Sequence, residues 1–197
     1  WLRYFIVECP TVDNDPAWAL PGDGMGAGSH ASFGQPDLPP IPAGFFDLGS
    51  EPFVGEVALR GPTPPGIATA LRRYAEPISP SAPPPAQGTI DVEIVSLSLV
   101  SIQPIVVSMN GGSSYETWNL QVTLSDPPPY ATPPLGTLHA TKTHANGGTF
   151  DVELYVQPLF TFTRASAPFD VRVLDTAGTL PPLHLGGAAL PWVHSVN

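Results

Sequence analysis

The chain has 197 residues, among them 27 Pro and 19 Gly, and its formal net charge is −10 at pH 7. A field of this sign repels phosphate groups, which argues against nucleic acid and anionic membrane surfaces as partners. A single cysteine excludes an intrachain disulfide and a multi-cysteine metal site, and no apolar run reaches the ~18 residues that a membrane span needs.

The spacing of Pro and Gly predicts many short strands joined by tight turns. Between these residues lie alternating patterns such as residues 149–156, and 42% of the chain is hydrophobic, which supplies a core that disordered chains lack. We therefore expect an all-β fold with at most one short helix. It is predicted to be an antiparallel β-sandwich of Greek-key or jelly-roll type, forming one domain over residues 1–197.

The first half of the chain mixes strands with irregular segments. Residues 3–9 and 53–60 alternate as strands do, whereas residues 10–49 form an irregular arm or long loop rich in Pro and Gly. Apolar residues spaced at i, i+3, i+4 and i+7 predict a short helix over 66–74. A Pro-rich crossover over 77–88 then connects the two halves.

The second half holds the clearest strand patterns. Over residues 89–102 the apolar side changes parity twice, which predicts bulges or a strand that crosses from one sheet to another. Asn-Gly-Gly at 110–112 and at 146–148 predicts two hairpins. The expected core residues are Ile90, Val92, Trp118, Leu120, Val122, Leu124, Phe150, Val152, Leu154, Phe160, Phe162 and Val171.

Two segments of the second half are similar, residues 88–94 (Gly-Thr-Ile-Asp-Val-Glu-Ile) and residues 148–154 (Gly-Thr-Phe-Asp-Val-Glu-Leu). Their acidic residues fall on the outward face of each predicted strand. Two exposed strands that independently alternate acidic and branched residues explain this similarity without a duplication.

Asp13, Asp15 and Asp23 are the candidate metal ligands. Several carboxylates in a Gly-rich segment suit calcium, although the order is not that of an EF-hand and the same residues also start turns by bonding their own backbone. His139 and His144 lie five residues apart and would face opposite sides of a regular strand. Isolated surface histidines are therefore favoured over a zinc or copper site.

Trp18, Phe33, Phe45 and Phe46 are the candidate binding residues. Such rings can stack on the sugars of a polysaccharide, or they can anchor the arm to its own sheet. A third interpretation is that the arm covers an apolar groove on a neighbouring copy, which would give a homo-oligomer or an extracellular assembly. The length of the arm and its few charges favour this third hypothesis.

Several segments resemble uncharacterised secreted β-proteins of environmental bacteria. They are residues 39–46, 50–57, 94–107, 146–150 and 158–164. The resemblance implies an exported all-β protein with a surface or extracellular-matrix role, and it carries no catalytic assignment.

The sequence contains no Gly-x-Ser-x-Gly, His-Glu-x-x-His or P-loop motif. We therefore expect a secreted or cell-surface structural or binding module, self-assembling through its arm, rather than an enzyme. Two alternatives stay open. One is a hydrolase or metal-dependent enzyme whose site is assembled from Asp, Glu and His residues, and the other is a carbohydrate-binding β-sandwich.

Overall fold

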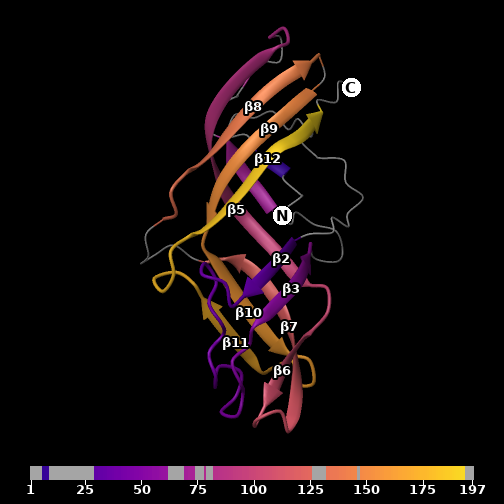
Figure 1. Cartoon of the computed structure of the whole chain (residues 1–197), viewed down its shortest axis with the longest axis vertical. Helices are drawn as coiled ribbons and strands as arrows, with labels where there is room; N and C mark the ends of the chain where they lie inside the picture. The colour runs from indigo at the N-terminus through magenta and orange to yellow at the C-terminus, as the bar shows by residue number, and fades with distance from the viewer. Residues whose placement is uncertain are drawn as a thin grey trace.

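The computed structural model describes residues 6–8, 29–61, 69–73, 78, 82–125, 132–145 and 147–193. These residues form strands, turns and irregular segments without any helix, which confirms the predicted all-β class (Figure 1). The described ranges accordingly hold no helix with the length and apolarity that a bilayer span requires. The strands are β1 (Ile6–Glu8), β2 (Ser29–Phe33), β3 (Gly55–Arg60), β4 (Thr69–Arg73), β5 (Ala86–Ser101), β6 (Ile105–Met109), β7 (Ser114–Leu124), β8 (Gly136–His144), β9 (Gly147–Val156), β10 (Pro158–Arg164), β11 (Val171–Asp175) and β12 (Leu183–Val193).

All strands belong to one hydrogen-bonded network, and the molecule is elongated (Figure 1). The upper sheet has the order β1-β4-β5-β8-β9-β12, and the lower sheet has the order β2-β3-β5-β7-β10-β11, with β6 beside β7. Pairing is antiparallel except between β1 and β4, which are parallel. The two sheets are therefore continuous through β5 rather than separate layers.

The first of the two parity changes predicted over residues 89–102 corresponds to this crossing strand, whereas the second is wrong, because Val100 is half-buried and Ile102 is 53% exposed. The first part of β5 pairs with β8 and its last part with β7, and a register shift interrupts its pairing with β4 between Ala70 and Leu71. An irregular register reverses which side chains face inward. As a result β5 contributes to both cores, through Ile90 and Val92 above and through Leu97 and Leu99 below.

The helix predicted over 66–74 is wrong, because its described part, Thr69–Arg73, is strand β4. A helix of two or three turns is only marginally stable in water, so tertiary packing and strand pairing decide which structure the segment adopts. Here the backbone is drawn into the upper sheet between β1 and β5. The apolar residues do have helical spacing, but strand pairing with β1 and β5 outweighs this local preference.

The arm is more ordered than predicted. Strand β2 lies within the expected irregular segment and pairs with β3 over its whole length, so the prediction is wrong for these five residues. Residues 34–50 are irregular, as expected, and they are tied down by two isolated bridges, Ile41 with Phe53 and Ser50 with Met109. The described arm therefore covers the lower sheet of its own chain.

The fold has two cores. The upper core contains Ile90, Val92, Leu138, Ala140, Phe150, Val152 and Leu154. The lower core is larger, and its biggest fully buried side chains are Trp118, Phe33, Phe46, Phe160 and Phe162. Every predicted core residue is buried except Leu124, which is half-buried, and Val171, which is 43% exposed. Alternation identified the two faces of β11 but assigned them wrongly, because Leu174, not Val171, packs on the lower core.

Both predicted hairpins are confirmed. The β6–β7 turn contains Asn110, Gly111 and Gly112, with φ angles of 51°, 68° and 85°, a left-handed backbone that Gly and Asn adopt most easily. Gly148 belongs to the β8–β9 hairpin. No strand pattern marks β12 in the sequence, because its Leu-Gly-Gly-Ala-Ala stretch lacks β-branched residues; pairing with β9 orders this strand instead.

Candidate functional site

The structure separates the predicted site residues into two groups. Asp13, Asp15, Asp23 and Trp18 lie outside the described residues. The rings of Phe33, Phe45 and Phe46 pack within the lower core, where Phe45 and Phe46 meet edge-to-face at 5.0 Å and Phe33 meets Phe160 at 5.3 Å between ring centroids. Phe33 and Phe46 are fully buried in their own chain, against the lower core. This burial agrees with the anchoring interpretation for these two residues; a binding role of the four aromatic residues and assembly through the arm stay predictions.

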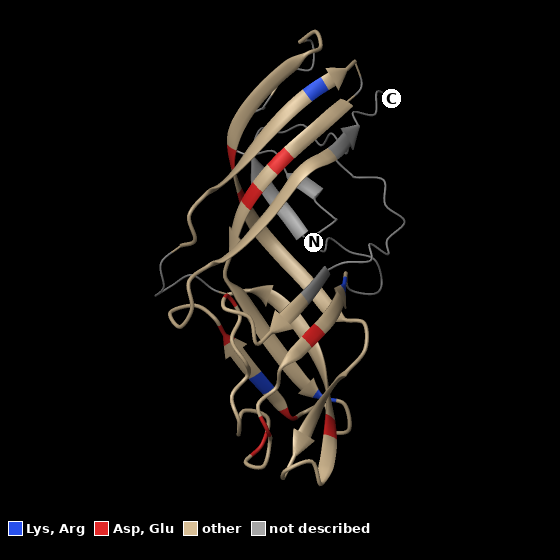
Figure 2. Ribbon diagram, viewed as in Figure 1, with Lys and Arg blue, Asp and Glu red and all other residues tan. Residues whose placement is uncertain are grey.

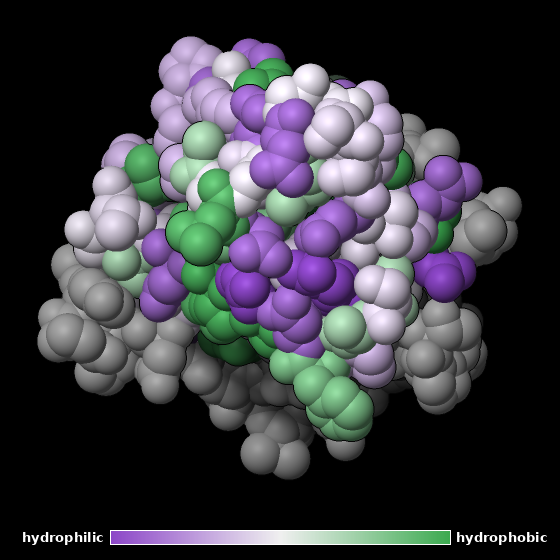
Figure 3. Space-filling model, turned by 90° about the horizontal axis from the view of Figure 1, so that it is seen from below, coloured by the Kyte–Doolittle hydropathy of each residue, from purple (hydrophilic) through white to green (hydrophobic). Residues whose placement is uncertain are grey.

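Hydrophilic side chains gather on the face seen from below (Figure 3), and Arg164 forms a cluster of ion pairs in the lower half of the molecule. Arg164, at the end of β10, lies 3.1 Å from Asp47, 3.0 Å from Glu116 and 2.9 Å from Asp170. The Asp170 contact is an ion pair whose alignment falls short of a hydrogen bond, since Arg164 Nε has no hydrogen-bond acceptor. Asp170 also pairs with Arg172.

This cluster fastens the arm to the sheet. Arg172 Nε donates to the carbonyl of Phe46 at 2.9 Å, and both guanidinium groups lie over the ring of Trp118, at 4.9 and 5.6 Å from its centroid. Asp47 Oδ1 accepts the N–H of Leu48 at 2.8 Å, and this bond, with the Arg164 guanidinium, lowers the pKa of the Asp47 carboxyl. Because every charge here has an internal partner, the cluster has a structural role.

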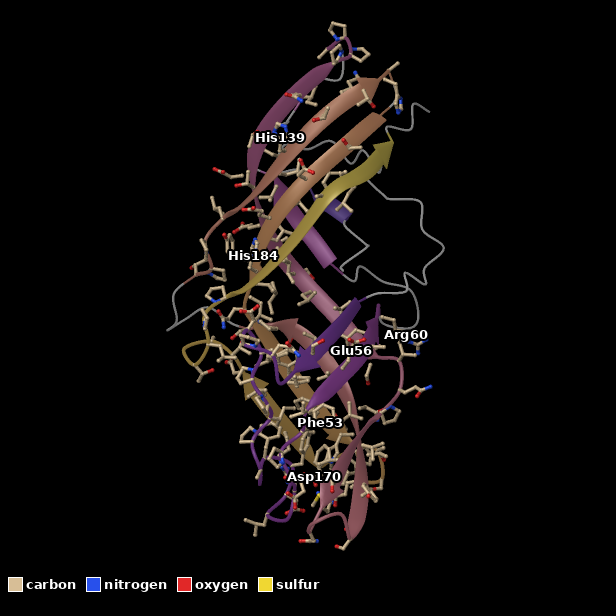
Figure 4. All side chains as sticks on the ribbon, in the orientation of Figure 1. Phe53, Glu56, Arg60, His139, Asp170 and His184 are labelled. Carbon is tan, nitrogen blue, oxygen red and sulfur yellow. The ribbon has the colours of Figure 1, made fainter. Side chains whose placement is uncertain are left out.

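The outer side of the upper sheet carries a different set of polar side chains. Positions opposite to the buried ones on β5, β8, β9 and β12 face outward, because side chains alternate across a strand. We call this surface the polar face, and His139 and His184 on it lie far from Asp170 at the lower end (Figure 4). It consists of Gln87, Thr89, Asp91, Glu93, Thr137, His139, Thr141, Thr149, Asp151, Glu153, Tyr155 and His184.

Strand register arranges these side chains in rows. Thr89, His139 and Asp151 are direct neighbours on β5, β8 and β9. In the adjacent row Asp91 and Glu153 flank Thr137. Neighbouring strands are about 4.8 Å apart and alternate residues on one strand about 6.7 Å apart, so the polar face is a grid of hydrogen-bonding groups.

Several members of the grid already hold one another in place. Thr89 Oγ1 and His139 Nδ1 are 2.8 Å apart, a hydrogen bond across two strands. Asp151 Oδ1 accepts the N–H of Ala189 at 2.7 Å, where β12 has a register shift. The rings of Tyr155 and His184 lie 5.2 Å apart and tilted by 33°. These contacts hold the side chains of the polar face in defined orientations.

A hydroxyl, an imidazole and a carboxylate in one row invite comparison with a catalytic triad. In such a triad the carboxylate holds the histidine, whereas Asp151 Oδ1 is bonded to the backbone of Ala189. Acyl transfer also needs free N–H groups to stabilise an oxyanion. Here β8 and β9 each have a paired strand on both sides, so their ladder N–H groups are engaged. The arrangement is therefore poorly suited to acyl transfer.

Metal binding finds no support in the described ranges. No three His, Cys, Asp or Glu side chains among them lie close enough to hold an ion together. The carboxylates of the polar face are spread over β5 and β9, with β8 between them (Figure 2). The calcium site predicted from Asp13, Asp15 and Asp23 falls outside these ranges and stays a prediction.

Comparison with family models, with curated proteins and with solved structures finds no match to this chain. Function must therefore be argued from the geometry of the polar face.

Sequence reasoning missed the polar face because it treated its members one strand at a time. Alternation predicts that the acidic residues of segments 88–94 and 148–154 face outward, and it predicts that His139 is an isolated surface histidine. The structure inserts β8 between these two similar strands and brings His139 between Thr89 and Asp151. The similarity of the two segments was the available indication that they line one surface.

Proposed function

We propose that the chain is an extracellular, non-catalytic binding module whose polar face binds an uncharged polysaccharide. The observation that carries the proposal is the ordered row Thr89, His139 and Asp151, next to the tilted ring pair Tyr155 and His184. Sugar hydroxyls donate and accept hydrogen bonds, and this row offers hydroxyl, imidazole and carboxylate partners for them.

The ring pair supplies the second element of sugar recognition. An aromatic ring gives a sugar an apolar surface, and its polar edge stays available for hydrogen bonds. Tyr155 is half-buried and His184 is exposed, so their rings lie at the surface rather than in the core. A row of polar groups beside such a platform favours an extended chain of sugars over a small compact ligand.

The charge of the face selects the class of polysaccharide. Asp91, Glu93, Asp151 and Glu153 place four carboxylates on this surface, which repels polyuronic and sulfated chains. Uncharged glucans and mannans meet no such repulsion. An extracellular location is consistent with this ligand and with a composition in which only 12% of residues are charged.

Affinity electrophoresis and titration calorimetry against soluble glucans, mannans and a polyuronic acid test the proposal. We expect binding to at least one uncharged polysaccharide and none to the polyuronic acid. Tyr155→Ala and Gln87→Ala should each weaken binding about tenfold, near 1.4 kcal/mol. The matched control is Gln121→Ala, an exposed glutamine on the lower sheet, which should leave binding unchanged.

Two results would contradict this function. If no uncharged polysaccharide binds, or if Gln121→Ala weakens binding as much as Gln87→Ala, the polar face is not the site. Release of reducing ends from a bound polysaccharide would favour the hydrolase alternative, and loss of that release in Thr89→Ala or His139→Ala would assign the row a catalytic role.

A further inference from the structure

Gly186 is an exposed position of β12 that has room for a side chain. Its neighbours Leu185 and Gly187 are half-buried, and Leu185 packs on both cores, so Gly186 faces outward with the polar face. A Cβ built at Gly186 would meet the carbonyl oxygen of Val152 at 3.8 Å and Cε1 of His184 at 3.9 Å, and nothing closer. Both distances are ordinary van der Waals contacts, so packing does not require glycine here.

Two other strand glycines are constrained by their neighbours. A Cβ at Gly148 would overlap a backbone carbonyl oxygen, and one at Gly187 would collide with the side chain of Leu190. The left-handed residue of the β12 irregularity is Ala189, with a φ of 51°, so the irregularity does not demand a glycine at position 186 either. Glycine weakens a strand because its backbone loses the most freedom on folding. A strand glycine that neither space nor backbone requires is typical of a place where a ligand approaches closely.

The place of Gly186 is between two parts of the polar face. Its direct partner on β9 is Glu153. The next outward pair on one side is the ring pair Tyr155 and His184, and the next outward residue of β9 on the other side is Asp151. Alternate residues of a strand are about 6.7 Å apart, so about 13 Å separates the ring pair from Asp151. A single ligand that contacts both must therefore pass over Glu153 and Gly186.

We propose that Gly186 is a specificity-determining position, whose missing side chain lets a chain of uncharged sugars run along β9 and β12 from the ring pair to Asp151. This inference rests on the polysaccharide binding proposed above. The sugar that passes over Gly186 lies on bare backbone, and the Glu153 carboxylate accepts a hydrogen bond from one of its hydroxyls. A larger side chain at this position would project beside the His184 imidazole into the space that the sugar occupies, and would exclude the ligand.

Titration calorimetry against a soluble glucan and a soluble mannan tests the inference in two variants. Gly186→Val should weaken binding by about tenfold or more and Gly186→Ala by a smaller factor, because the obstruction grows with the side chain. Urea unfolding should find both variants about as stable as the native chain or more stable, since the surrounding space is open and valine favours a strand. The matched control is Asn119→Val, which places the same side chain at an exposed position of β7 on the lower sheet and should leave binding unchanged.

The outcomes separate this inference from the function on which it rests. If the native chain binds and Tyr155→Ala weakens binding, but Gly186→Val binds as tightly as the native chain, the inference is overturned and the proposed function stands. Should Gly186→Val fail to fold, unchanged affinity of Gly186→Ala overturns it in the same way. An equal loss of binding in Asn119→Val also overturns it, since the effect is then not one of this position. If the native chain binds neither polysaccharide, the inference and the proposed function both fail.

Discussion

Arg164 is the counter-ion of three carboxylates. Its guanidinium pairs with Asp47 in the arm, Glu116 in β7 and Asp170 before β11, three segments that are far apart in the sequence. Removing one partner of such a cluster leaves the remaining charges without compensation, which is why clusters of this kind tolerate substitution poorly. The residue thereby joins the arm to the sheet that it covers.

Asp47 makes this junction sensitive to acid. Its folded-state pKa lies below the ordinary value of 3.8, chiefly through the Leu48 N–H and then through Arg164. A depressed carboxyl pKa gives stability that is present above the unfolded-state pKa and is lost as the pH falls through the folded-state pKa. The relevant window is therefore below about pH 4.

We expect Asp47→Asn to be less stable than the native chain at neutral pH, with the difference closing as the pH falls below about 4. Urea unfolding across that range measures it. Asp37→Asn, an exposed aspartate of the same arm outside the cluster, serves as the control and should follow the native curve. A constant difference between Asp47→Asn and the native chain at all pH values would mean that ionisation of Asp47 is not involved.

At the scale of single elements, the β8–β9 hairpin depends on close backbone approach. Gly148 pairs with Lys142, just before a register shift between Lys142 and His144. A Cβ built at Gly148 would overlap the carbonyl oxygen of Thr141, a backbone atom that has little freedom to move inside the sheet. Glycine is required here by space, not by a left-handed backbone.

Gly148→Ala should therefore destabilise the fold by about 3 kcal/mol, at the upper end of what overpacking usually costs. Gly186→Ala on β12 is the matched control, because its new methyl group would meet nothing closer than 3.8 Å; its effect should stay within about 0.5 kcal/mol. Chemical denaturation of the two variants and the native chain gives both numbers. Equal stability of the two alanine variants would show that β8 and β9 can move apart.

Period-two alternation predicted most elements because strands with one buried face leave a local pattern. It identified β3, β7, β9 and β10 and the inward residues of each. It failed where the deciding contact is non-local. The spacing of apolar residues predicts a helix where β4 forms, because the pairing of β4 with β5 leaves no pattern in its own residues. Alternation predicts the wrong inward face for β11, because only packing distinguishes Leu174 from Val171.

The candidate site was less predictable than the fold for the same reason. Outward placement of Asp91, Glu153 and their neighbours followed from alternation, but no local pattern states that β8 lies between β5 and β9. The Thr89–His139 contact joins residues fifty positions apart and depends wholly on that topology. The buried positions of Phe33 and Phe46 likewise depend on how the arm folds back over the lower sheet.

At the scale of the whole molecule, β5 joins the two halves. It pairs with strands of both sheets, and Ile94 near its middle packs against both the upper and the lower core. Leu185 on β12 also contacts both cores. A strand shared in this way transmits the loss of either core to the other, so both halves should unfold in a single transition.

Ile94→Ala tests this coupling. Truncation of a half-buried isoleucine at the junction should cost about 2 kcal/mol, near the lower end for such substitutions in a core. Hydrogen exchange followed by mass spectrometry reports each half separately, through peptides from β8–β9 above and from β7–β10 below. If the halves are coupled, the slowest-exchanging amides of both sets lose protection equally, because each exchanges only when the whole molecule opens.

Val107→Ala, which removes atoms from the lower core alone, should then lower protection in β8–β9 as well. Protection that falls only in β7–β10 in this variant would show instead that the two halves open independently and that β5 is a hinge between them.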